Sequence, residues 1–151
     1  SRVGVLLFVR TLGEEIFAGN LTDSYLSQTV NFLNQKPISV FATYSNQGNT
    51  YLNPYGYIEF KNLITRSVIL EPVEPWFVLP NSLRTREVVG PTLAPGMYTV
   101  KILMNRGYDN IIDESKKHYL IRLDAVTTSV LGSLVFLLVI ILIFKIKKKY
   151  V

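Results

Sequence analysis

The sequence has no cysteine among its 151 residues. This absence excludes disulfide bonds, thiol catalysis, and zinc or iron–sulfur centres that are bound through cysteine. A folded domain in this chain is therefore stabilised by side-chain packing and hydrogen bonds alone.

Catalytic motifs are also missing. The chain contains no H-E-x-x-H motif, no P-loop and no dinucleotide-binding fingerprint. The single histidine, His118, lies in a stretch that we predict to be a strand, with no adjacent nucleophile elbow. Glu14 and Glu15 are a candidate pair of catalytic carboxylates, but adjacent residues on a strand point to opposite faces, so a solvated turn explains them better. We therefore predict a protein that is not an enzyme and has no cofactor.

The third absence is of charge over a long segment. Residues 125–144 are twenty consecutive residues without a charged side chain. At about 1.5 Å of rise per residue, a helix of this length spans about 30 Å, the thickness of the hydrocarbon core of a bilayer. The segment therefore predicts a transmembrane helix whose partner is membrane lipid.

The flanks of this segment predict its orientation. Lysines follow the span directly, whereas the charges of Arg122 and Asp124 on the other flank cancel. Lysine-rich flanks stay on the cytoplasmic side of a membrane. We therefore predict a single-pass protein of the plasma membrane, with residues 1–124 outside the cell and residues 145–151 as a cytoplasmic tail. The lysines that set this topology are Lys145, Lys147, Lys148 and Lys149.

The formal net charge of +5 has the same origin. Four of the 16 Lys and Arg residues lie in the tail, which leaves 12 of them against 11 acidic residues in residues 1–124. Topology and attraction to anionic lipid explain the basic tail, so we predict no nucleic-acid partner.

The start of the chain lacks an initiator methionine and the pattern of a signal peptide. The apolar run Val3–Val9 is short and is typical of a buried strand. Because a protein of this topology needs an export signal, we expect the sequence to be part of a longer precursor.

Residues 1–124 show short apolar or alternating segments separated by turn signals. The clearest alternation is in 37–46, where Ile38, Val40, Ala42 and Tyr44 fall on one side of the pleat. Seven to nine such strands and no amphipathic helix predict an all-β fold, an immunoglobulin-like β-sandwich, followed by one C-terminal helix. The other predicted strands are 3–10, 16–21, 55–61, 66–71, 75–80, 83–89, 97–104 and 118–123.

Four short segments carry a resemblance to a known family: Tyr44–Asn49, Leu52–Ile58, Val78–Ser82 and Pro95–Val100. They resemble the cell-surface proteins related to the WxL-interacting proteins of Gram-positive bacteria, with an N-x-G-N loop, an L-P-x-S crossing and a G-x-Y step. The resemblance covers residues 37–151. It implies an exported immunoglobulin-like domain held by a C-terminal helix with a basic tail, and it implies a preceding extracellular domain. The chain departs from the pattern in its long loop around residues 111–114, and no binding residue is carried over.

One loop is a candidate for calcium. Oxygen ligands gather in residues 105–114, and hard cations prefer several such ligands in a flexible loop. The loop lacks the spacing of an EF-hand, and a hairpin loop whose Asp and Asn side chains bind the local backbone explains the same composition. The candidate ligands are Asp109, Asn110, Asp113 and Glu114.

The aromatic residues offer a candidate binding surface. Nine Tyr and eight Phe suit a β-core, where aromatic side chains pack across strands. Four of the aromatic residues are alternatively members of an exposed patch for a sugar or a protein: Tyr51, Tyr55, Tyr57 and Trp76. Exposed aromatic area distinguishes the two interpretations.

These observations predict a non-enzymatic, membrane-anchored cell-surface protein that serves adhesion, binding or scaffolding outside the cell. Its expected partners are membrane lipid through residues 125–144 and another surface or membrane protein, and a small-molecule substrate is not expected. The alternative is an accessory single-span subunit of a larger membrane complex, in which the small residues Gly132 and Ser133 allow close helix contact.

Overall fold

The structure is a computed structural model and describes residues 13–32 and 37–149. The strand predicted at residues 3–10 lies outside these residues. The described elements are β1 (Gly19–Leu26), β2 (Val30–Phe32), β3 (Ser39–Asn46), β4 (Tyr55–Asn62), β5 (Val68–Val73), β6 (Ser82–Val89), β7 (Gly96–Asn105), β8 (Ile112–Glu114), β9 (His118–Leu123) and α1 (Ala125–Lys149).

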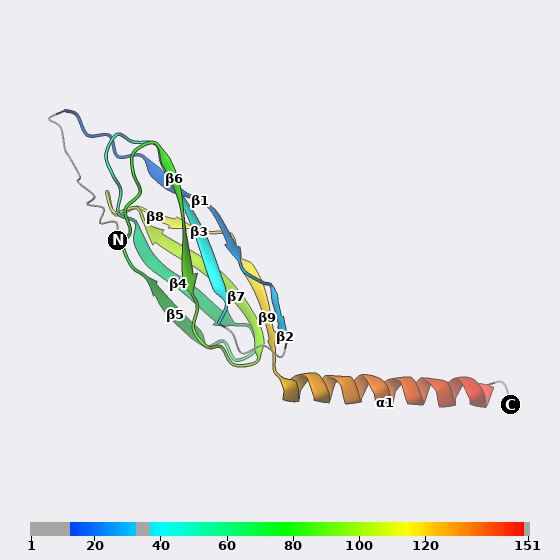
Figure 1. The fold of residues 1–151 in the computed structure, drawn as a ribbon. Helices are drawn as coiled ribbons and strands as arrows, with labels where there is room; N and C mark the ends of the chain where they lie inside the picture. Colours follow the sequence, from blue (N-terminus) through cyan, green and yellow to red (C-terminus); the bar gives the residue numbers. More distant parts are fainter. Residues whose placement is uncertain (1–12, 33–36, 150–151) are drawn as a thin grey trace, which may run out of the picture.

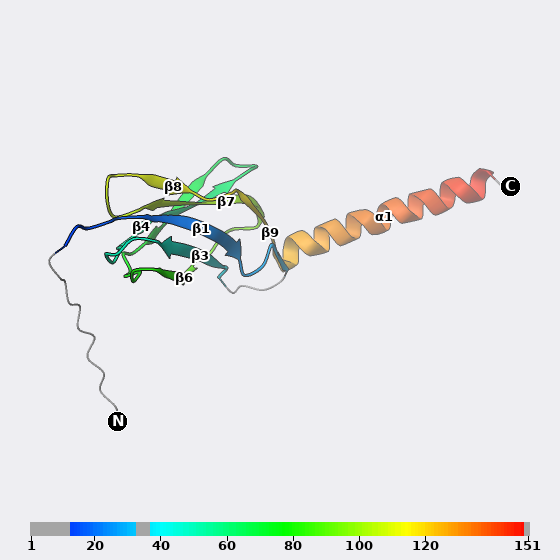
Figure 2. The same ribbon diagram turned by 90° about the horizontal axis from the view of Figure 1, so that it is seen from above.

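The strands form two sheets, which Figures 1 and 2 show as two layers with the helix leaving one end. The first sheet has the order β1-β3-β6 and is antiparallel throughout. The second has the order β2-β9-β7-β4-β5, with β8 paired to β7 beyond the end of β9. Only β2 and β9 run parallel among the described pairs. The prediction of an all-β fold with one C-terminal helix is confirmed.

Both sheets contribute to one core. On β3 the side chains of Val40, Ala42 and Tyr44 are buried, as the alternation predicted. They share a single cluster with buried residues of β4 and β7, among them Phe60 and Ile102. Successive side chains of a strand point to opposite faces, so each central strand gives one row to this core.

The pairing of the strands defines two ends of the β domain. The helix end holds the β4–β5 hairpin and the junction between β9 and α1, because Asn62 pairs with Tyr98 and Gly96 pairs with Arg122. The far end holds loops 47–54, 74–81 and 105–111, because β3, β4 and β7 all turn there. Figure 1 shows α1 leaving the end opposite these loops.

Two predicted strands differ from the structure. A strand was expected at 16–21, but β1 begins at Gly19 and continues to Leu26. The expected strand at 75–80 is reduced to one bridge between Leu52 and Val78. Proline cannot donate to a ladder, and Pro75 and Pro80 bound this segment, so pairing stays local.

The helix α1 follows β9 after one residue. That residue, Asp124, caps the helix: its Oδ1 accepts from the Thr127 amide at 2.8 Å, and the Asp124 amide donates to the Thr127 hydroxyl at 3.1 Å. Hydrogen bonds from the side chain and amide of Thr127 lower the pKa of the Asp124 carboxyl. This reciprocal cap fixes where the helix begins.

Residues Ala125–Ile143 of α1 have a mean hydropathy of 2.7, and none of this segment is buried against the β domain. The segment is long and apolar enough to cross a membrane. The side chains of its middle, such as Phe136 and Leu138, are exposed in the chain alone. An apolar helix that the domain leaves uncovered requires an apolar environment elsewhere.

Candidate functional site

Two aromatic rings are presented together at the far end. The rings of Tyr51 and Phe77 meet edge to face, with centroids 5.6 Å apart and an interplanar angle of 65°. Their loops are joined because Leu52 and Val78 exchange two backbone hydrogen bonds of 2.9 Å. Both rings remain exposed, Tyr51 by 41% and Phe77 by 43%. Leu52 and Val78 point into the core, and successive side chains of an extended segment point to opposite faces. Tyr51 and Phe77, which precede them, therefore point outward.

A third exposed ring, that of Tyr55, lies at the same end of the β domain. Tyr55 is the first residue of β4. Its backbone lies beside that of Phe77, because the Trp76 amide donates to the Pro54 carbonyl. We call Tyr51, Tyr55 and Phe77 the far-end aromatic cluster. Rigid amphipathic rings of this type supply binding surface at low conformational entropy cost.

A buried asparagine holds the loop that carries Tyr51. Asn46 is 1% exposed, and its Nδ2 donates to the carbonyls of Thr50 and Val78 at 2.8 and 3.0 Å. Its Oδ1 accepts from the Gly48 amide at 2.9 Å. These three bonds satisfy the side chain and tie both loops to the end of β3, so the cluster rests on a fixed base.

The four predicted aromatic residues are thus divided by the structure. Tyr51 and Tyr55 lie in the far-end cluster, and Tyr57 lies exposed two residues farther along β4. Trp76 is in the core instead, 4% exposed, with its ring edge against Tyr44. The Arg86 guanidinium lies over the Trp76 ring at 5.6 Å.

The residue that sequence reasoning missed is Phe77. The segment 75–80 alternates, with Trp76 and Val78 buried and Phe77 and Leu79 exposed. All four of these residues are apolar, so the sequence shows no alternation that could have told the exposed Phe77 from the buried Trp76.

Two of the four predicted calcium ligands, Asp113 and Glu114, form ion pairs with basic side chains. Asp113 accepts from Arg106 Nε at 3.1 and 3.2 Å on its two oxygens and from Nη2 at 2.7 Å, and Glu114 pairs with Lys101. The hydrogen bonds to Asp113 raise the pKa of Arg106, which keeps the guanidinium charged. Asp109 and Asn110 adopt the left-handed conformation, with φ of 54° and 51°, and form the turn.

Among residues 13–32 and 37–149, no three His, Cys, Asp or Glu side chains are grouped so that they could share a metal ion. The Asp113 carboxylate has a structural task there. Its Oδ2 accepts from the Leu21 amide of β1 at 3.1 Å, so it links the two sheets. Tyr108 adds a second link, because its hydroxyl accepts from the Gly19 amide at 2.7 Å. The loop therefore closes one side of the β domain.

The structure brings a serine to the single histidine. Ser24 Oγ of β1 lies 2.8 Å from Nε2 of His118 on β9, across 94 residues of sequence. No local motif could have predicted this contact. A hydrolytic triad also needs a carboxylate on Nδ1, and within the described part of the chain His118 has no such hydrogen bond. The pair is a third link between the sheets.

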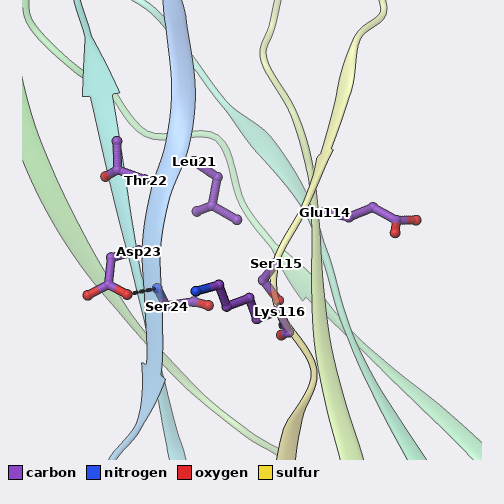
Figure 3. Close-up of a pocket in the computed structure, with 7 residues that line it drawn as sticks. All are labelled: Leu21, Thr22, Asp23, Ser24, Glu114, Ser115 and Lys116. Atoms are coloured by element: carbon purple, nitrogen blue, oxygen red, sulfur yellow. Dashed lines mark hydrogen bonds between the residues drawn. The ribbon is translucent and has the colours of Figure 1, made fainter.

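A shallow pocket of about 210 Å³ lies beside this pair, between β1 and the β8–β9 connection. Figure 3 shows its polar lining and the Lys116 side chain directed toward β1. The residues that line it are Leu21, Thr22, Asp23, Ser24, Glu114, Ser115 and Lys116. It is smaller and more polar than typical small-molecule sites, which enclose about 300 to 1,000 Å³ of mostly apolar surface.

No family model and no curated protein matches this chain. Among solved structures, it is similar to a β-glucosidase from Erythrobacter marinus with a TM-score of 0.48 and 12% identity, over 71% of this chain and 16% of the enzyme. A β-glucosidase from Kluyveromyces marxianus aligns with a TM-score of 0.37 and 14% identity, over 74% of this chain and 15% of the enzyme. The chain thus spans a small part of either enzyme, and similarity at this level does not extend their activity to it.

Proposed function

We propose that this chain is a non-enzymatic cell-surface protein, anchored in the plasma membrane by α1, whose β domain presents a binding surface outside the cell. The observation that carries the proposal is the placement of the exposed cluster of Tyr51, Tyr55 and Phe77 at the end opposite the helix. A helix in the membrane holds one end of the domain, and the far-end cluster then faces outward.

The architecture supports an immunoglobulin-like β-sandwich. Its two sheets share one core, and three side-chain links join β1 to the second sheet. Such domains commonly bind partners through loops at one end of the sandwich. The relation to the WxL-interacting proteins belongs to the same proposal and rests on the turn and strand segments that resemble that family.

The binding partner is proposed to be another surface protein. The far-end cluster is aromatic and lies on a fixed base, as is common for the central residues of protein interfaces. Tyr51 and Phe77 lie on loops, Tyr55 begins β4, and all three rings are exposed, which fits a macromolecular surface better than an enclosed small-molecule site.

Topology is tested first, by cysteine labelling of intact cells. The chain has no cysteine, so Leu83→Cys on β6 and Lys145→Cys after the span each introduce a single reactive site. A membrane-impermeant maleimide should label Leu83→Cys on intact cells, and Lys145→Cys only after permeabilisation. The reverse pattern would contradict the proposed orientation.

Binding is tested with a photoreactive amino acid at position 51. In native membranes it should form a defined cross-linked product with a protein, and Phe77→Ala should reduce that product because the two rings pack together. Position 119 is the matched control, since Tyr119 is 64% exposed on a different surface, β9. Equal cross-linking at both positions would argue against a specific site.

The alternative function is an accessory subunit of a larger membrane complex. One feature favours it: Gly132 and Ser133 place two small residues side by side on α1, which allows a partner helix to approach closely. Purification in mild detergent distinguishes the two, because a subunit elutes with its partners. A monodisperse single chain would support the surface-protein proposal.

A further inference from the structure

The β4–β5 hairpin ends in exposed aliphatic residues at the helix end. Ile64 is 73% exposed and Leu63 is 44% exposed, and Met97 on the neighbouring strand is 45% exposed. Leu63 and Met97 are adjacent, since the Leu63 amide donates to the Met97 carbonyl at 2.8 Å. We call these three residues the helix-end apolar rim.

The hairpin turn is held tightly around one buried side chain. Asn62 is 4% exposed, and its Oδ1 accepts from the amides of Ile64 and Thr65 at 2.8 and 3.0 Å. Its carbonyl accepts from the Arg66 amide at 3.0 Å, and Arg66 takes a φ of 61° to close the turn. The turn therefore fixes Ile64 outward, so its exposure does not come from a loose loop.

Strand pairing sets the distance of this rim from α1. Met97 pairs with Ile121 of β9, and β4 is two strands away from β9, or about 10 Å across the sheet. Leu63 is thus level with Ile121, three residues before Asp124. Figures 1 and 2 show that the helix leaves this same end of the domain.

A short junction keeps this end close to any membrane that α1 enters. Only Asp124 separates β9 from α1, and it is hydrogen-bonded to the first turn of the helix. The polar layer on each side of a bilayer is about 5 to 7 Å deep. Leu63 lies about 10 Å of extended strand before Asp124, and Ile64 lies one residue farther along the turn toward the membrane, so Ile64 comes to the outer edge of that layer.

We propose that the helix-end apolar rim inserts into the headgroup layer of the membrane as a second contact beside α1. The ligand is the lipid surface: Ile64 and Leu63 bury aliphatic area, and the exposed Arg66 side chain at the same turn can donate to lipid phosphate. Two contacts about 10 Å apart restrict the tilt and rotation of the domain, and so set the direction of the far-end cluster. This inference rests on the proposed membrane span.

The test uses the full chain in vesicles of phosphatidylcholine and phosphatidylglycerol. Ile64→Cys is labelled with an environment-sensitive fluorophore, which reacts nowhere else because the chain lacks cysteine. Lipids that carry a nitroxide near the headgroup should quench this label severalfold more than the same label on Leu83→Cys. Leu83 is a matched control, because it is 68% exposed but lies at the far end.

Val130→Cys, in the predicted span, reports on the anchor itself. If nitroxide lipids with the label deep in the chain region quench Val130→Cys while Ile64→Cys behaves like Leu83→Cys, the rim proposal is overturned and the span stands. If Val130→Cys is not quenched, the proposed span fails, and the rim proposal fails with it. Shielding of the Ile64 label in native membranes but not in lipid vesicles would assign the rim to a protein partner and also overturn the proposal.

A second measurement needs no label at the turn. Hydrogen exchange of the amides of residues 63–66 should be slower in vesicles than in detergent for the natural sequence. Ile64→Asp should remove this difference, because a carboxylate opposes burial among anionic lipids, and Leu83→Asp should leave it unchanged. An unchanged difference in Ile64→Asp would contradict lipid insertion of the turn.

Discussion

The two long sides of the β domain are closed in different ways. On one side, β1 is linked to the second sheet by bonds from Tyr108, Asp113 and His118. On the other, β5 and β6 are separated by a groove of about 280 Å³, and half of the residues that line it are charged. We call these the linked side and the open side.

The difference shows two ways to protect the edge of a sheet. On the linked side, the amides of Gly19 and Leu21 are occupied by side chains, so β1 cannot recruit another strand there. On the open side, β5 carries Pro72 and β6 carries Arg86 and Glu87, which discourage pairing through a missing donor and through charge. Stability should therefore depend on side-chain bonds mainly at the linked side.

The largest expected effect is that of Asp113→Ala. The substitution removes a carboxylate whose side chain is 13% exposed and leaves Arg106 and the Leu21 amide without their acceptor. We expect a loss of about 2 kcal/mol in the free energy of unfolding. Denaturant unfolding of the detergent-solubilised chain, followed by Trp76 fluorescence, measures it. A loss no greater than that of a surface substitution would show that the linked side is not stabilised by this residue.

Next is Ser24→Ala. The hydroxyl lies 2.8 Å from His118 Nε2, and a partly buried hydrogen bond contributes about 1 kcal/mol. A double-mutant cycle with His118→Ala isolates the pair, and we expect the effects of the two substitutions to be less than additive. Full additivity would mean that the contact contributes nothing.

Tyr44→Phe should be neutral or stabilising at neutral pH, by up to about 1 kcal/mol, because it removes a buried hydroxyl that has no hydrogen-bond partner among the described residues. Burial, and then the nearby Asp113 carboxylate, raise the pKa of Tyr44. The unfolded state therefore loses its proton first, at about pH 10, and stability falls as the pH rises above that value. Urea unfolding between neutral and alkaline pH should show a smaller fall in Tyr44→Phe. An equal fall in both proteins would contradict the role of Tyr44.

The smallest effect is expected on the open side. Glu87→Gln changes a residue that lines the groove but forms no ion pair within the described residues. The change in unfolding free energy should stay within about 0.5 kcal/mol. A loss comparable to that of Asp113→Ala would remove the distinction between the two sides.

The sequence predicted the elements that depend on local pattern. The alternation in 37–46 identified the core row of β3, and the uncharged run identified α1. The strand predicted at 75–80 was wrong in its extent, because only the bridge at Val78 forms between the two prolines.

The contacts between distant residues were beyond sequence patterns. Ser24 meets His118 only because the two sheets stack, and Asp113 binds Arg106 because β8 folds back on β7. The same pairing removes the support for a calcium site in this loop, because the Asp113 oxygens that a metal would need already accept hydrogen bonds from Arg106 and from the Leu21 amide. Phe77 was missed for a related reason: it lies in a uniformly apolar run, and only the packing of Trp76 and Val78 into the core leaves it exposed.

The junction at Asp124 has a mechanical consequence. A flexible connection adds about 3.5 Å of slack for each extended residue, and this one consists of a single residue whose backbone and carboxylate are bonded to Thr127 and Thr128. A pull or twist applied at the far end is therefore passed to the first turn of α1 with little lost along the way. The β domain and the first turn of α1 should therefore turn together as one body.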